Sequence, residues 1–185
     1  MKLSRTATIG AVALLCGAAT LGVAQIIRLD LPGMVGMADN AVHGTITARE
    51  VIRIDHPTDG PELYFTALTV QGRSLITNQP TTVDVWFGGG FINETEGVHN
   101  SEAPSADDQK IGNEVVVFYR WEPNMGGDHA GNGLICWHGG LFRTFQTRTG
   151  KTIVQGRGEG YAIDTNIELG DLETQIQKLA KAKQK

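Results

Sequence analysis

The sequence predicts a mainly β fold, a small twisted β-barrel or half-open roll of the size of an OB barrel, with an amphipathic helix at its C-terminus. Three observations favour this class: several short segments rich in β-branched residues, one segment that is apolar on both faces, and a C-terminal segment with helical periodicity. Short, closely spaced strands with turn residues between them are typical of barrels and of sandwiches. A two-sheet β-sandwich is therefore the alternative architecture.

Seven segments have the composition of strands, and glycine, proline or asparagine residues separate most of them. The expected strands are 42–54, 63–70, 81–87, 114–121, 134–137, 141–147 and 152–154. The fourth contains the uninterrupted apolar run from Val115 to Tyr119, which is the pattern of a strand buried on both faces. We expect this strand to be central, and we expect aromatic residues such as Trp121 and Trp137 to pack in the core.

Helical periodicity is clearest at the C-terminus, over residues 170–183. Leu172, Ile176 and Leu179 recur on one face, acidic residues precede them and lysines follow, in agreement with the helix dipole. We expect this helix to pack across the sheet. A second, short helix is predicted over residues 105–112, because a serine can cap its first turn and a glycine can end it.

The N-terminal segment predicts export. Residues 6–27 carry no charge, basic residues precede them, and the small residue Ala24 offers a cleavage site, so residues 1–24 have the pattern of a secretory signal peptide. We expect a periplasmic or extracellular protein. Two alternatives place it at a membrane: the uncharged run is long enough for an uncleaved anchor, and Cys16 lies in a sequence that resembles a lipidation box.

The remainder of the chain is long enough for one domain with a hydrophobic core. Its proline- and glycine-containing start predicts a flexible leader over residues 25–41, followed by a single β-rich domain over residues 42–185. The formal net charge of −4 argues against a nucleic-acid partner, because such a partner requires a basic surface. Cys136 would be the one cysteine left after cleavage, so we expect no intramolecular disulfide.

The stretch from Trp86 to Tyr119 combines a triple glycine, Pro104, the turn sequence 112–114 and the apolar strand. In this pattern it resembles a family of small exported bacterial β-domains of uncharacterised function, some of which are encoded near matrixin-like zinc proteases. The resemblance implies a β-fold and offers a hint about partners. The chain itself lacks the His-Glu-x-x-His motif that zinc hydrolysis by such a protease needs.

The glycine-rich segment after the third expected strand is the first candidate binding site. Consecutive glycines permit either a barrel corner, which is the commoner role, or close approach of a ligand to the backbone. The candidate binding residues are Gly88, Gly89, Gly90, Phe91 and His99. A second irregular loop, over residues 124–133, is the other candidate contact region, because long loops on a rigid barrel often carry function.

A second candidate site contains a cysteine and two histidines. Cys136 and His138 would share one face of an expected strand, and His129 could fold over from the preceding loop to complete a soft-metal or thiol site. The simpler interpretation is a small buried cysteine and two histidines that are solvated or hydrogen-bonded. We therefore expect an exported, non-catalytic binding or accessory protein without a cofactor, whose partner is another exported protein or the envelope surface. A metal-dependent or thiol enzyme is the alternative.

Overall fold

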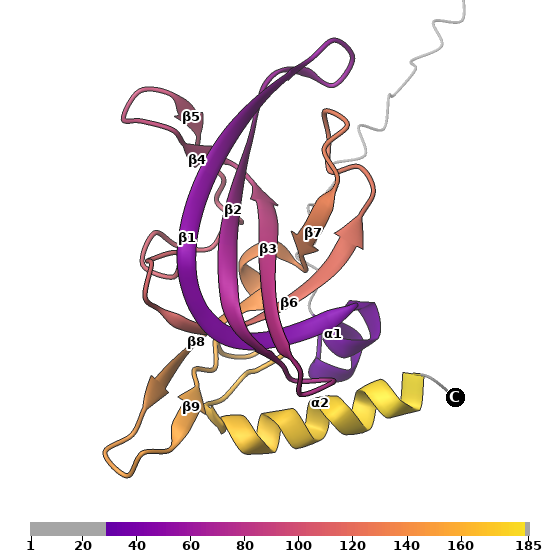
Figure 1. Cartoon of the computed structure of the whole chain (residues 1–185), viewed down its shortest axis with the longest axis vertical. Helices are drawn as coiled ribbons and strands as arrows, with labels where there is room; N and C mark the ends of the chain where they lie inside the picture. The colour runs from indigo at the N-terminus through magenta and orange to yellow at the C-terminus, as the bar shows by residue number, and fades with distance from the viewer. Residues whose placement is uncertain (1–28, 184–185) are drawn as a thin grey trace, which may run out of the picture.

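The computed structural model describes residues 29–183 of the 185-residue chain (Figure 1). The predicted signal peptide and its two alternatives, the anchor and the lipidated Cys16, lie outside the described residues. Within residues 29–183, no helix has both the length and the apolar character that crossing a bilayer requires.

Five strands close into a barrel in the order β1-β2-β3-β7-β6, with β6 pairing back onto β1. Their bounds are β1 (Asn40–His56), β2 (Gly60–Ser74), β3 (Pro80–Gly88), β6 (Glu114–Glu122) and β7 (Gly131–Leu134). Neighbouring strands are antiparallel except β3 and β7, which are parallel. The prediction of a small β-barrel followed by a C-terminal helix is therefore confirmed.

Further helices and strands come before, between and after the barrel strands in the sequence and pack around the barrel (Figure 1). These are α1 (Leu31–Met37), the small sheet of β4 (Gly90–Phe91) and β5 (Gly97–Val98), the 3₁₀ turn η1 (Trp137–Gly140), β8 (Leu141–Gln146), β9 (Thr152–Val154), β10 (Ile167–Glu168) and α2 (Leu169–Lys183). β8 continues the sheet from β6, β9 pairs with β8, and β10 pairs with β9. α2 then runs across the base of the barrel beside α1.

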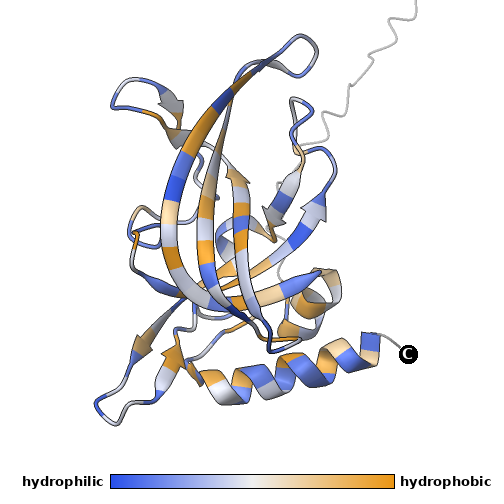
Figure 2. Cartoon of the chain, viewed as in Figure 1, coloured by the Kyte–Doolittle hydropathy of each residue, from blue (hydrophilic) through white to orange (hydrophobic). Residues whose placement is uncertain are grey.

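β6 is buried on both faces, as its apolar run predicts. Val115 and Val117 point into the barrel core, whereas Val116 and Phe118 belong to a second core formed with the two helices and with β8 and β9. Val117 is 0% exposed. The strands that border solvent alternate between apolar and polar residues, which is visible along β1, β2 and β3 in Figure 2.

α2 is held to the barrel by its apolar stripe and by one ion pair. Leu172 and Ile176 are fully buried in the second core. The guanidinium of Arg73, at the end of β2, donates two hydrogen bonds to the carboxylate of Glu173, at 2.5 and 2.6 Å. The helix that the sequence predicts over 170–183 therefore packs on its own domain.

The predicted leader differs from the structure over residues 31–37, which form α1. The Asp30 carboxylate accepts a hydrogen bond from the Gly33 N–H at 2.8 Å and so caps the helix, and proline is tolerated in a first turn. Met34 and Val35 are buried in the second core. This part of the expected leader is thus an ordered element of the domain.

The short helix predicted over residues 105–112 is a series of turns. Ser105 does cap the first turn by accepting a hydrogen bond from the Asp108 N–H at 3.2 Å. The segment does not continue as a helix because the Gly112 N–H donates instead to the Ile46 carbonyl of β1, at 2.8 Å. This bond fastens the long connection between β3 and β6 to the barrel.

Candidate functional site

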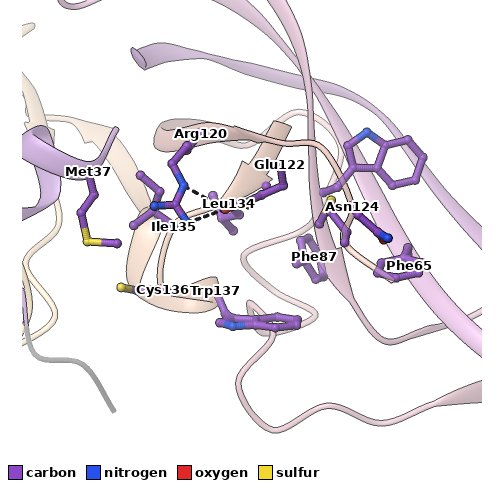
Figure 3. A pocket seen from close by; sticks show the side chains of 13 residues that line it. Met37, Phe65, Phe87, Arg120, Glu122, Asn124, Leu134, Ile135, Cys136 and Trp137 are labelled. Atoms are coloured by element: carbon purple, nitrogen blue, oxygen red, sulfur yellow. Dashed lines mark hydrogen bonds and ion pairs between the residues drawn. The ribbon is translucent and has the colours of Figure 1, made fainter. Parts of the chain in front are cut away.

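A cavity of about 250 Å³ opens on the outer face of the barrel, where β2, β3, β6 and β7 approach η1 (Figure 3). Its lining includes four aromatic side chains, those of Phe65, Trp86, Phe87 and Trp137, together with Arg120 and Cys136. We call this cavity the tryptophan pocket.

The strand alternation of β3 places Trp86 in the pocket. Val83, Val85 and Phe87 belong to the barrel core, so the side chain between the last two projects outward. Gly131 of β7 makes room for the indole, because a β-carbon at that position would lie 2.8 Å from Trp86 Cδ1. A glycine on one strand thus fixes the position of an aromatic wall on its parallel neighbour.

Trp137 reaches the pocket through an unusual backbone conformation. Cys136 and Trp137 have φ values of 50° and 52°, so two consecutive non-glycine residues lie in the left-handed region. Each such residue costs on the order of 1–3 kcal/mol, and strain of this kind concentrates at functional sites. The strand predicted over 134–137 is therefore wrong beyond Leu134, where β7 ends and the chain turns into η1.

His138 holds η1 against the connection between β3 and β6. Its Nδ1 lies 2.8 Å from the Glu102 carbonyl oxygen, and its Nε2 lies 3.0 Å from the Tyr161 hydroxyl. A carbonyl can only accept, so Nδ1 carries a proton and donates, while Nε2 forms the second hydrogen bond with the Tyr161 hydroxyl. The role of His138 in the structure is therefore to position the segment that carries Trp137.

Cys136 lines the pocket, but its thiol is not activated. Burial raises the pKa of the Cys136 thiol, and the nearby Arg120 offsets this only in part. The thiol is thus protonated at neutral pH and a poor nucleophile. Arg120 itself is engaged, since its Nε donates to the Glu122 carboxylate at 2.8 Å, and Figure 3 shows this ion pair beside Leu134.

His129 packs among the aromatic residues at the edge of the same face. Its ring centroid lies 4.4 Å from that of Trp86 and 5.4 Å from that of Phe65. Burial lowers the pKa of His129, which favours the neutral imidazole. The metal site proposed from His129, Cys136 and His138 does not form: across residues 29–183, no three His, Cys, Asp or Glu side chains converge in a way that could hold a metal ion.

The residues predicted from the glycine-rich segment line two open grooves next to the pocket. Gly88, Gly89 and His99 border a groove of about 390 Å³, and Gly90, Phe91 and His99 border a wider one of about 940 Å³. Gly88 also contacts the pocket, because a β-carbon there would lie 2.8 Å from Trp137 Cζ3. The triple glycine therefore serves close packing at Gly88 and lines the grooves.

The pocket as a whole can accept a small apolar group between aromatic rings, with one ion pair at its rim. Sequence reasoning missed it, because the tryptophans were assigned to the core, whereas Trp137 is 37% and Trp121 55% exposed. Comparison with models of protein families, with curated proteins and with solved structures finds no match to this chain.

Proposed function

We propose that the protein is an exported, non-catalytic binding module that recognises another exported protein by taking one of its apolar side chains into the tryptophan pocket. The observation that carries this proposal is the strained pair Cys136–Trp137, which places an indole at the wall of an open cavity at a cost in backbone strain. Export is inferred from the uncharged N-terminal segment and its basic flank.

The size of the cavity favours a side chain over a free metabolite. Sites for drug-sized ligands have volumes of roughly 300–1,000 Å³, and the tryptophan pocket measures about 250 Å³. A single aromatic or aliphatic side chain that enters a pocket rich in tryptophan is the usual anchor of a protein interface. The groove of about 390 Å³, which shares Phe65 with the pocket, would then receive the residues next to that anchor.

The chemistry of the lining supports binding without catalysis. The thiol of Cys136 is protonated, His138 has both ring nitrogens engaged, and the carboxylate of Glu122 is paired with Arg120. The nucleophile, base and orienting group of a thiol enzyme need mutual hydrogen bonds. Here each group is used to build the pocket.

The test is a titration followed by NMR. The protein is titrated with N-acetyl-tryptophanamide, N-acetyl-phenylalaninamide and N-acetyl-leucinamide, and the indole N–H resonances of its tryptophans are recorded. We expect shifts at Trp86 and Trp137, which line the pocket, and none at Trp121, which is exposed elsewhere and serves as the internal control. Absence of shifts, or equal shifts at all three, would refute the proposal.

A further inference from the structure

One edge of β1 carries no strand over half of its length. β6 pairs with β1 only from Asn40 to Thr45, and the last bonds on this side join Ile46 to Asn113 and Gly112. From Thr47 to His56, no backbone hydrogen bond from any part of residues 29–183 reaches this edge. The hairpin of β1 and β2 rises beyond the barrel at this point (Figure 1). An open edge of this length is a template for a further strand.

The wider of the two grooves reaches this part of β1 at Arg49. It lies between Arg49 of β1 and the connection that carries β4, β5 and residues 98–111, and has a volume of about 940 Å³. Three large apolar side chains line it while exposed: Phe91 (45%), Val98 (45%) and Ile111 (64%). We call it the edge groove. Exposed apolar side chains gathered beside an open strand edge are typical of an interaction surface.

The charges of the edge groove favour an acidic occupant. Its lining contains Arg49 and Lys110 and neither aspartate nor glutamate, although the chain as a whole has a net charge of −4. Lys110 is paired with Asp107 at 2.7 Å. Arg49 donates from Nε to the neutral Gln109 amide at 2.9 Å and has no ion-pair partner in the described part of the chain. Its two terminal nitrogens can therefore take a carboxylate.

We infer that β1 binds an extended segment of a partner protein by strand addition. The backbone of that segment pairs with the open edge around Val51, alternate apolar side chains enter the edge groove against Phe91 and Ile111, and one carboxylate meets Arg49. Backbone pairing supplies affinity, whereas the groove and the guanidinium select the sequence. This surface is separate from the tryptophan pocket, so the inference does not depend on the anchor proposed there.

The probe is a phage-displayed library of nine-residue peptides, selected against the purified protein. We expect the recovered peptides to alternate apolar and polar residues and to carry one aspartate or glutamate. Synthetic copies are then measured by fluorescence anisotropy. N-methylation of alternate backbone nitrogens should weaken binding by roughly tenfold or more, because only strand addition uses the peptide backbone.

Matched variants separate this surface from the pocket. Phe91→Ser and Arg49→Gln, both at exposed positions, should each weaken binding by roughly fivefold or more, whereas Trp137→Ala should leave it unchanged. A failed selection, peptides that tolerate N-methylation, or binding lost only in Trp137→Ala would overturn strand addition; the last result would still agree with the anchor pocket. A dimer in light scattering that Phe91→Ser dissociates would show that a second copy occupies the edge.

Discussion

The indole of Trp137 lies directly on Gly88, so that a β-carbon at position 88 would come within 2.8 Å of its Cζ3 atom. β3 and η1 are thereby joined at the wall of the tryptophan pocket. Asn100 strengthens the same junction, since its side-chain N–H donates to the Gly88 carbonyl at 2.9 Å. The absence of a side chain at position 88 therefore allows the Trp137 indole to lie where it does.

Gly88→Ala should displace the Trp137 indole and close or distort the pocket. We expect a loss of stability of about 1–2 kcal/mol, because a small-to-large change strains a packed contact, together with loss of the Trp137 shift in the amide titration. Gly36→Ala is the control: this glycine lies exposed in α1 with no atom near its β-position, and the change should stabilise by up to about 1 kcal/mol. If Gly88→Ala keeps the wild-type stability and the Trp137 shift, the contact between Gly88 and Trp137 does not shape the pocket.

The apolar stripe of α2 should contribute strongly to stability. Leu172→Ala and Ile176→Ala should each cost about 2–4 kcal/mol, because both side chains are fully buried and their removal leaves cavities. Lys178→Ala and Lys181→Ala should cost about 0.5 kcal/mol or less. Urea denaturation measures the free energy of unfolding of these four variants. If all four changes have equally small effects, the packing of α2 does not stabilise the domain.

The free energy of unfolding should decrease in mild acid, because the pKa of His43 is lowered in the folded protein. Burial lowers the pKa of His43, Glu114 and Glu173 oppose this shift, and Arg73 adds to it. Below the ordinary histidine pKa of about 6.5, His43 binds a proton in the unfolded chain but not in the folded protein. The free energy of unfolding therefore decreases as the pH falls from 6.5 towards the lowered pKa. The loss is complete only below the lowered value.

The measurement is the free energy of unfolding of the wild type and of His43→Gln at pH 7.5 and pH 5.5. The variant should lose less stability between the two pH values than the wild type does. The same change at exposed His99 is the matched control. Equal effects of the two substitutions on the pH dependence would contradict the assignment to His43.

If the N-terminal segment is the signal peptide that the sequence predicts, the N-terminus should be processed. Protein recovered from an exporting host should begin near Gln25, because the small residue Ala24 precedes it. Intact-mass spectrometry distinguishes the alternatives. Retention of residues 1–24 would indicate an uncleaved anchor, and a lipid-modified chain that begins at Cys16 would indicate acylation.

Periodicity predicted the parts of the fold in which burial follows a simple repeat. The two-sided strand β6 and the amphipathic helix α2 lie where their apolar patterns place them, since a strand repeats every two residues and a helix every 3.6. The flexible leader was predicted from composition, and α1 contradicts that prediction. Its proline and glycines suggested a flexible segment, whereas Asp30 caps a helix that tertiary packing then holds.

The candidate site could be predicted only in part, because its form depends on backbone conformations that leave no mark in the sequence. Neither Cys136 nor Trp137 is a residue that signals a positive φ, and a strand continuing through them was the simpler expectation. That expectation placed Cys136 and His138 together and produced a metal site that the turn abolishes. The glycine cluster did signal close approach, and Gly88 is one place where it occurs.

The most direct test of the tryptophan pocket compares Trp137, which lines the pocket, with Trp121, which is exposed outside it. N-acetyl-tryptophanamide is titrated into the wild type, Trp137→Ala and Trp121→Ala, and the dissociation constant is obtained from the Trp86 indole N–H shift. We expect a Kd on the order of 1 mM for the wild type and for Trp121→Ala, and no measurable saturation for Trp137→Ala, since Trp137 lines the cavity and Trp121 does not. Equal affinity in all three proteins would contradict the claim that this pocket binds an apolar side chain.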